Sequence, residues 1–301
     1  MQKERLTRKG KDPRTNSFSI YTSTFNTDPE ALRNVFEHIK AQNYRIWEWV
    51  VFDDSTEEHV WPLLMEFKKE HLGVKPYTYK REGIDKKYWA SEKRSDNNVG
   101  FTKKICCSLS TGKFLLELDH DDYLAPNALK TIAQAAKAYP EAGFFYSDYV
   151  EPNFEMNDYR WYPDHWGQGF GAHYWYWNND TNAYTLACRS PNINFTTLND
   201  ITAVPNHVRV WKADAYEKAG GYNDEYKVVD DYDLILRTVK AGVEMVKIPQ
   251  PLYFQHFHNN QTQQKYKPLI RQLSDNARNE HLKGLQEKFP GHEVDNRNSF
   301  E

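Results

Sequence analysis

The feature that most restricts the fold is an alternation of short apolar stretches with longer amphipathic ones in the first half of the chain. Residues 18–23 (FSIYTS) and 47–52 (WEWVVF) have the apolar, β-branched and aromatic character of buried strands. Residues 30–42 between them have the spacing of an amphipathic helix, and Asp28 and Pro29 form a typical helix start. This β-α-β order predicts a mostly parallel sheet with helices on both faces.

The same pattern continues along the chain and extends the predicted sheet. We expect one helix to end near residue 69, a second to span residues 99–110 and a third to follow Pro126, with strands at 77–80, 113–118 and 143–149. In a parallel sheet, ligands bind at the carboxyl ends of the strands. Acidic clusters follow two of the predicted strands, so a ligand site is expected at that edge of the sheet.

Composition separates a main domain from the segments around and within it. The segment at 151–205 is rich in Gly, Asn and aromatic residues, which predicts an irregular insertion or lid rather than a second core. Helical spacing returns at residues 212–219 and 232–240. The expected parts are a basic N-terminal arm at 1–16, a main domain at 17–262 that contains the insertion, and a C-terminal helical extension at 263–301.

The charge balance argues against a surface built for duplex nucleic acid. Lys and Arg number 39 against 42 for Asp and Glu, the net charge is −3, and only the first 14 residues lean basic. No apolar run approaches the ~18 residues that cross a bilayer, the first residues lack the short apolar stretch typical of a signal peptide, and the three cysteines lack metal-ligand spacing. We therefore expect a soluble, cytoplasmic protein without a transmembrane segment, which could still associate with a membrane surface. The oligomeric state stays open.

The densest acidic cluster directly follows the apolar stretch at 113–118. Asp119, Asp121 and Asp122 place three carboxylates within four positions. Carboxylates this close repel one another, and a divalent cation that prefers oxygen ligands would offset the repulsion. A metal site is the favoured interpretation, and a solvated turn that caps the next helix is the alternative.

Two further acidic clusters suggest a binding turn and a catalytic base. Asp53 and Asp54 follow the strand at 47–52, where a carboxylate can accept a hydrogen bond from a nucleobase or a ribose hydroxyl. Asp230 and Asp231 open a helical stretch, and one of them could act as a general base. The alternative is that acidic residues are favoured at helix N-termini for electrostatic reasons alone.

Two histidines near the end of the main domain are candidate ligands for the same cation. His256 and His258 lie on alternate residues. In an extended chain their side chains point in opposite directions, so only one of them can face a given metal. The spacing does not decide between them.

Taken in order, these stretches resemble the family 2 glycosyltransferases of the GT-A fold. The resemblance covers about residues 17–262 and depends on the order and spacing of several parts rather than on any single motif. The matching parts are the opening strand at 19–26, the turn Asp53-Asp54-Ser55-Thr56, Asn98-Val99-Gly100, the DxD-type motif Asp119-His120-Asp121-Asp122, and Gly220-Gly221-Tyr222 with residues 230–237. It implies a Rossmann-like α/β fold with an aromatic-rich insertion on the acceptor side.

The resemblance also implies a reaction, namely transfer of a sugar with inversion from a nucleotide-diphosphate donor, expected to be a UDP-sugar. Mn²⁺ or Mg²⁺ would bind the diphosphate, and Asp231 would take the proton from the acceptor hydroxyl. By the same resemblance, the donor nucleotide contacts Thr24, Asn26, Asp54, Asn98 and Asp119, the metal contacts Asp121 and His258 with His256 in reserve, and the acceptor contacts Trp161, Trp166, Trp175, Trp177 and Asp230.

The sequence departs from the family pattern at two places. The usual Glu-Asp pair is Asp230-Asp231 here, and the usual arginine near the late histidine is missing, because Gln255 and Phe257 flank His256. Two other functions remain open: metal-dependent nucleotidyl or phosphoryl transfer, and non-catalytic binding of a nucleotide sugar. The sequence has no Walker-type glycine-lysine loop, which disfavours phosphoryl transfer, and a pure binding module would not need Asp231.

Overall fold

The computed structural model describes residues 17–78, 98–151, 172–178, 182–200, 202, 204–256, 266–282 and 285. A sheet with the strand order β3-β2-β1-β4-β9-β6-β10-β5 lies at its centre, and a hairpin of β7 and β8 is attached to β6. The strands are β1 (Phe18–Thr24), β2 (Trp47–Asp53), β3 (Val74–Thr78), β4 (Phe114–Glu117), β5 (Tyr123–Leu124), β6 (Phe144–Val150), β7 (His173–Asn178), β8 (Ala183–Cys188), β9 (Arg209–Lys212) and β10 (Met245–Phe254).

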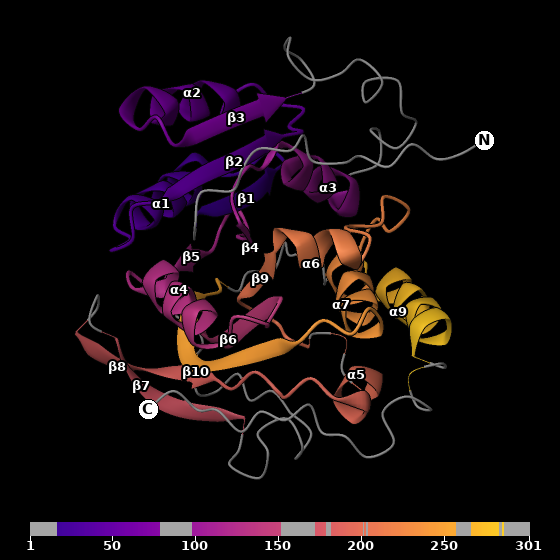
Figure 1. Cartoon of the computed structure of the whole chain (residues 1–301). Coiled ribbons are helices and arrows are strands. Elements are labelled where there is room, and N and C mark those ends of the chain that lie inside the picture. Colours follow the sequence, from indigo (N-terminus) through magenta and orange to yellow (C-terminus); the bar gives the residue numbers. More distant parts are fainter. Residues whose placement is uncertain are drawn as a thin grey trace.

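Helices cover both faces of this sheet (Figure 1). One face packs against residues such as Leu64 and Leu129, and the other against Phe101 and Leu234. This two-sided cover confirms the predicted α/β class with a central sheet flanked by helices. The helices are α1 (Pro29–Lys40), α2 (Val60–Glu70), α3 (Val99–Leu109), α4 (Ala128–Ala138), α5 (Phe195–Asp200), α6 (Ala213–Lys218), α7 (Asp230–Lys240) and α9 (Lys267–His281).

Helix α1 shows how local sequence signals produce these elements. The Asp28 side chain accepts hydrogen bonds from the backbone N–H groups of Glu30 and Ala31, and Pro29 occupies the first turn. The apolar residues recur every three or four positions and form one buried stripe: Leu32, Val35, Phe36 and Ile39. Burying each of these side chains contributes about 1.5–3 kcal/mol, which fixes the helix against the sheet.

Strand direction explains how the edge of the sheet is built. Strands β1, β2, β3, β4, β6 and β10 run in one direction, and β9 runs antiparallel between β4 and β6. The carboxyl ends of β4, β6 and β10 therefore meet the amino end of β9 at one edge. Residues that follow β4 and β10 lie beside residues that precede β9.

The structure corrects the sequence prediction at several elements. The third strand begins at Val74 rather than at residue 77, because it pairs in register with β2 from Trp49 to Asp53, and residues 79 and 80 of the predicted strand lie outside the described residues. Strands β9 and β10 were not predicted, and the helix expected from residue 212 begins at Ala213 because Lys212 ends β9.

The aromatic insertion is more regular than expected, because two of its described parts form the β7–β8 hairpin. The hairpin is joined to β6 through Tyr149 and Val150. Buried Asp148 of β6 strengthens this junction, since it accepts hydrogen bonds from the Ser190 N–H at 2.8 Å and the Tyr174 hydroxyl at 3.1 Å. Lys247 of β10 lies 3.4 Å from the same carboxylate. Through this hairpin, the described part of the insertion extends the sheet.

Among the helices that the structure describes, none combines the length and the apolar character needed to cross a bilayer.

Candidate functional site

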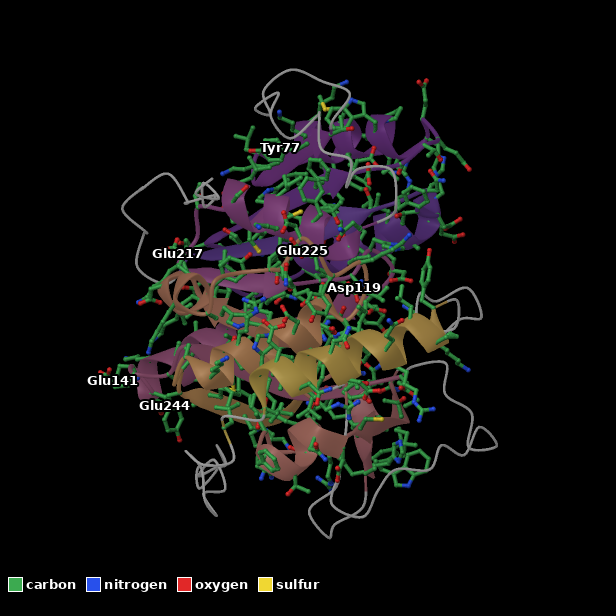
Figure 2. The ribbon with its side chains drawn as sticks, turned by 90° about the vertical axis from the view of Figure 1, so that its right-hand side faces the viewer. Tyr77, Asp119, Glu141, Glu217, Glu225 and Glu244 are labelled. Carbon is green, nitrogen blue, oxygen red and sulfur yellow. The ribbon has the colours of Figure 1, made fainter. Side chains whose placement is uncertain are left out.

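The predicted acidic edge is present where β4, β10 and the start of β9 meet. In the view of Figure 2, Asp119 lies between the purple N-terminal half of the molecule and the orange and yellow helices. Asp119 and Asp122 occupy the turn between β4 and β5, and His207 lies two residues before the start of β9. The reversed direction of β9 brings this histidine, which lies 85 or more positions further along the chain, to the two carboxylates.

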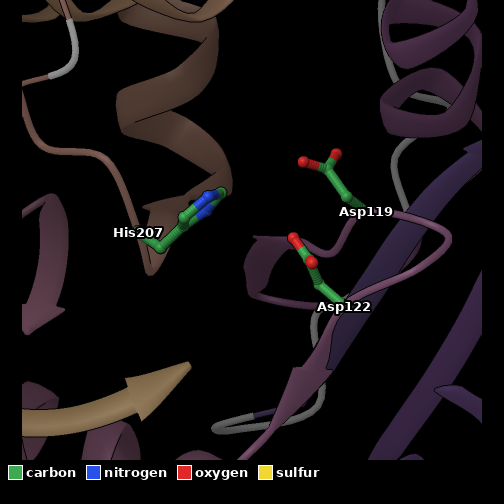
Figure 3. Close-up of side chains that lie close together, drawn as sticks. All are labelled: Asp119, Asp122 and His207. Atoms are coloured by element: carbon green, nitrogen blue, oxygen red, sulfur yellow. The ribbon is translucent and has the colours of Figure 1, made fainter. Parts of the chain in front are cut away.

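Asp119, Asp122 and His207 each place a ligand atom within 4.8 Å of the other two (Figure 3). Asp122 is buried, and its two oxygens accept hydrogen bonds from the Tyr253 hydroxyl and the His256 N–H, both at 2.8 Å. Burial and the neighbouring carboxylate of Asp121 raise the pKa of Asp122 well above its ordinary value. A bound cation would favour the ionised carboxylate at this position.

His207 has the properties of a metal ligand. It is 4% exposed, its ring stacks on Tyr253 with centroids 4.0 Å apart, and its buried Nε2 makes no hydrogen bond to any residue that the structure describes. Burial lowers the pKa of His207 well below its ordinary value, and the Arg209 cation lowers it further. The imidazole is therefore neutral, which is the form that binds metals. Two carboxylates and an orphaned imidazole nitrogen fit a divalent cation.

The aspartate and the two histidines that were predicted as metal ligands are not the residues that form this cluster. Asp121 does not belong to this cluster, although it lies in the same turn. The Nδ1 atom of His256 lies 2.8 Å from the backbone carbonyl oxygen of Asp121, which directs one ring nitrogen at the main chain. His258 lies outside the described residues.

In the turn after β2, Asp53 and Asp54 differ in burial. Asp53 is buried and accepts hydrogen bonds from the Thr24 hydroxyl at 3.0 Å and the Ser55 N–H at 3.1 Å. Asp54 is only partly buried, and its N–H donates to the Thr24 carbonyl oxygen at 3.0 Å. The structure thus locks Asp53 into the turn and brings the predicted pair Thr24 and Asp54 together.

The two predicted asparagines hold loops in place. Asn26 has φ of 49°, and its side-chain oxygen accepts from the N–H groups of Thr56 and Glu57, both at 3.0 Å. Asn98 caps α3 by accepting from the Phe101 N–H at 3.0 Å, and it donates to the Asp224 carbonyl oxygen at 2.7 Å. Both side chains shape the walls beside the strand ends through these bonds.

Asp230 and Asp231 begin α7, which starts two residues before the helical spacing predicted at 232–240, and their surroundings differ. Asp230 is 4% exposed and lies 3.1 Å from the Lys103 amine, and burial raises its pKa to about 6 although Lys103 opposes this. The side chain of Asp231 is 29% exposed, and its Oδ2 accepts a hydrogen bond from Arg209 at 2.6 Å. Of the pair, Asp231 is the carboxylate that a substrate can reach.

A buried charge cluster behind these residues was not anticipated from the sequence. Glu117 accepts hydrogen bonds from Lys103 at 2.5 Å, from Arg209 Nε and Nη2 at 2.9 Å each, and from the Tyr222 hydroxyl at 2.9 Å. Burial alone would raise the pKa of Glu117, but Arg209 and Lys103 hold it well below its usual range. Single charges inside apolar runs, such as Glu117 in FLLEL, were the available sequence signal.

The described part of the insertion presents an exposed aromatic face. Trp175, Trp177 and Tyr184 are 58%, 42% and 67% exposed, and Trp177 packs edge-to-face on Tyr184 with centroids 5.0 Å apart. Tyr174 and Tyr176 alternate with the tryptophans and pack against the core. Trp161 and Trp166 lie outside the described residues.

The sequence model described as "Glycosyl transferase family 2" matches residues 19–195. Two curated relatives are similar over most of this chain. One is the uncharacterized protein y4gI of Sinorhizobium fredii, 24% identical over 226 residues, which are 74% of this chain. The other is the O-antigen biosynthesis protein RfbC of Myxococcus xanthus, 25% identical over 236 residues, which are 78% of this chain. The chain spans only 20% of y4gI and 15% of RfbC.

Solved structures confirm the architecture. TarS 1-349 of S. aureus in complex with UDP-GlcNAc has a TM-score of 0.57 and 14% identity, over 81% of this chain and 60% of that one. The mannosyltransferase PcManGT of Pyrobaculum calidifontis in complex with GDP-Man and Mn²⁺ has a TM-score of 0.50 and 14% identity, over 84% and 64%. The fold of this chain is therefore the GT-A fold of these neighbours.

Proposed function

Because the chain belongs to glycosyl transferase family 2, we propose that it transfers a sugar from a nucleotide-diphosphate donor to an acceptor hydroxyl, with inversion at the anomeric carbon. The observation that carries this proposal is that a carboxylate cluster and a reachable carboxylate, Asp231, both lie beside the start of β9, since His207 comes just before this strand and Arg209 within it binds Asp231. One part suits the diphosphate end of a donor, and the other suits an acceptor.

Asp119, Asp122 and His207 are the residues we assign to a divalent cation, Mn²⁺ or Mg²⁺. Their oxygen and nitrogen atoms converge, and the unpartnered Nε2 of His207 lies among them. When bound, such a cation supplies positive charge that stabilises a departing diphosphate. Asp121 and His258, predicted from the family resemblance, are the alternative ligand pair.

Asp231 is the group we assign to the acceptor proton. The acceptor oxygen forms the new bond to the anomeric carbon and gives its proton to the Asp231 carboxylate, while the bond from that carbon to the diphosphate oxygen breaks and its electron pair leaves with the diphosphate. A single displacement of this kind inverts the anomeric centre. The position of Asp231 at the start of α7 supports this role, because its side chain is partly exposed whereas Asp230 is buried.

Thr24 and Asp54 are the residues we assign to the nucleoside, and Asn26 and Asn98 to the loops that shape its pocket. The exposed rings of Trp175 and Trp177 are the candidates for stacking on an acceptor sugar. Asp230, which resemblance placed near the acceptor, is buried against Lys103, so its contact with an acceptor finds no support in its surroundings.

The experiment that tests the proposal is release of nucleoside diphosphate from UDP-GlcNAc, other UDP-sugars and GDP-mannose, with Mn²⁺ and with EDTA. We expect metal-dependent release from one donor, and a loss of about 100-fold or more in Asp231→Asn with unchanged UDP affinity. Asp119→Asn should lose both release and metal-dependent UDP binding. Release of pyrophosphate in place of a nucleoside diphosphate would assign the site to nucleotidyl transfer, and UDP binding without any turnover would favour a binding module.

A further inference from the structure

We propose that Arg209 is a positioning residue for Asp231: it fixes the carboxylate that receives the acceptor proton, and it is itself fixed by buried Glu117. This inference rests on the proposed function, because it assigns a role in the same proton transfer. It adds a residue that the sequence motifs leave out, since Arg209 lies in a strand that sequence spacing did not predict.

Arg209 is held rigidly from one side. Its Nε and Nη2 atoms donate to the two oxygens of Glu117, at 2.9 Å each, in the paired geometry that orients a guanidinium plane. Arg209 is 4% exposed and Glu117 is 3% exposed, so water competes little for these bonds. The Tyr222 hydroxyl and the Lys103 amine hold Glu117 in turn. The guanidinium therefore has one orientation.

The remaining guanidinium nitrogen points at the proposed base. Arg209 Nη1 donates to Asp231 Oδ2 at 2.6 Å, and the Tyr232 N–H donates to Asp231 Oδ1 at 2.7 Å. Each carboxylate oxygen thus has one fixed donor and keeps a lone pair for a further proton. Because one donor comes from β9 and the other from α7, the carboxylate cannot rotate without breaking a bond.

Orientation of this kind matters because a proton acceptor must lie within hydrogen-bond reach of the reacting hydroxyl. A displacement of about 1 Å in a reacting group can lower a rate by about 100-fold. Lysine at position 209 would keep the positive charge but lose the paired contact with Glu117, because an ammonium group cannot form the guanidinium fork. Arg209→Lys therefore changes the geometry of the contact with Glu117 while the positive charge at position 209 is kept.

The test is Arg209→Lys, measured by nucleoside-diphosphate release and by UDP affinity in the presence of Mn²⁺. We expect kcat to fall by about 10- to 100-fold, with UDP affinity within about twofold of the wild type. Arg237→Lys is the matched control. Arg237 lies on α7 and binds Asp233 at 2.6 and 3.0 Å and the Ala219 carbonyl oxygen at 2.6 Å, rather than Asp231. This variant should keep the wild-type kcat.

A double variant shows whether Arg209 acts through Asp231. In an Asp231→Asn background, Arg209→Lys should lower kcat by less than about twofold more, because the group it positions is already lost. Additive losses would overturn the proposal, and so would a wild-type kcat in Arg209→Lys. A fall in UDP affinity that matches the fall in kcat would also overturn it, because Arg209 would then support donor binding.

Two further results keep the test decisive. If Arg209→Lys does not fold, Glu117→Asp keeps every charge and withdraws the carboxylate by one methylene, so it should lower kcat while UDP affinity holds; unchanged kcat would reject the proposal. If the wild type releases no nucleoside diphosphate from any donor, the proposed function fails first, and this outcome is distinct from a normal wild type with a normal Arg209→Lys.

Discussion

Glu117 is a charged residue in β4, whose neighbouring positions carry apolar side chains. The free-energy cost of burying its charge explains much of the local chemistry. A buried carboxylate is tolerated only where cations and donors surround it. Glu117 has Lys103, Arg209 and Tyr222 as partners, which come from α3, β9 and the loop before α7. One carboxylate therefore ties three distant parts of the chain to the strand that precedes Asp119.

Replacing Glu117 with Gln should destabilise the fold strongly. The change leaves Lys103 and Arg209 without their shared carboxylate, and breaking a buried ion pair by removing one partner costs about 3–5 kcal/mol. Urea unfolding at pH 7 measures the effect, with the exposed Glu217→Gln as control, which should change stability by less than about 0.5 kcal/mol. A Glu117→Gln protein as stable as the wild type would show that the charge is unnecessary.

The same carboxylate predicts how stability depends on pH. The folded protein holds the pKa of Glu117 well below its unfolded value of about 4.3, so this contribution is complete above about pH 5 and is lost as the pH falls further. Wild-type stability should therefore decrease between about pH 5 and pH 3 more steeply than that of Glu117→Gln. Parallel stability curves for the two proteins over this range would contradict the assignment.

His207 gives a prediction about metal binding. His207→Phe keeps a ring that can stack on Tyr253 and removes the nitrogen that lies beside Asp119 and Asp122. We expect Mn²⁺ affinity in the presence of UDP to fall by about 10-fold or more, measured by titration calorimetry. His256→Phe is the comparison, because it tests the reserve ligand. Loss of Mn²⁺ binding in His256→Phe alone would move the cation to the later histidine.

At the scale of elements, the contact between α3 and the start of α7 has no spare room. A Cβ atom on Gly100 would lie 2.7 Å from the Tyr226 carbonyl oxygen and 2.8 Å from that of Asn223, and both are backbone atoms. It would also lie 3.0 Å from the Cβ of Asp230. The glycine therefore lets α3 approach the loop that positions Asp230 and Asp231.

Gly100→Ala should push these elements apart. We expect a loss of about 1–3 kcal/mol in unfolding free energy, as for other overpacked sites, together with lower nucleoside-diphosphate release because Asp231 moves. Ser108→Ala on the same helix is the control, with a loss below about 1 kcal/mol, since it adds no volume and removes only a bond to the Ile105 carbonyl oxygen. Unchanged stability and turnover in Gly100→Ala would show that the contact relaxes freely.

Sequence reasoning predicted elements whose signals are local. The Asp28 cap, Pro29 and the apolar stripe of α1 lie within about a dozen residues, and each acts in the structure as expected. Strand β9 has only four residues and carries the charged Arg209, so its sequence does not show the pattern of a strand. The hairpin of β7 and β8 was not predicted, because aromatic residues on both of its faces obscure the alternation of apolar and polar residues that is typical of a strand.

The residues of the candidate site also fall into two groups, those with a local sequence signal and those without one. Asp119 and Asp231 belong to motifs that are read locally: Asp119 lies at the expected edge of the sheet, and Asp231 lies at the start of a helix. His207 and Arg209 sit in a stretch, Asn206-His207-Val208-Arg209, without any recognisable motif. Their positions depend on β9 running between β4 and β6, and strand order is a non-local property that spacing along the chain does not contain.

For the whole molecule, ligand binding should appear as added stability. A ligand that binds only the folded state at 100 times its Kd stabilises that state by about 2.7 kcal/mol. UDP with Mn²⁺ at such concentrations should raise the melting temperature by about 5 °C or more, and EDTA should reverse most of the rise. AMP with Mn²⁺ is the control. An equal rise with AMP would argue against selection for the uracil nucleotide.

The antiparallel strand β9 has a consequence for how the protein is made. During synthesis Glu117 leaves the ribosome 92 positions before Arg209, and β10, which carries Tyr253, follows later still. A nascent chain can form β1, β2 and β4, but the strand that pairs with both β4 and β6 is missing until β9 has been synthesised. The cluster of Asp119, Asp122 and His207 therefore cannot form before β9 has been made, and Asp122 gains its Tyr253 donor only once β10 follows.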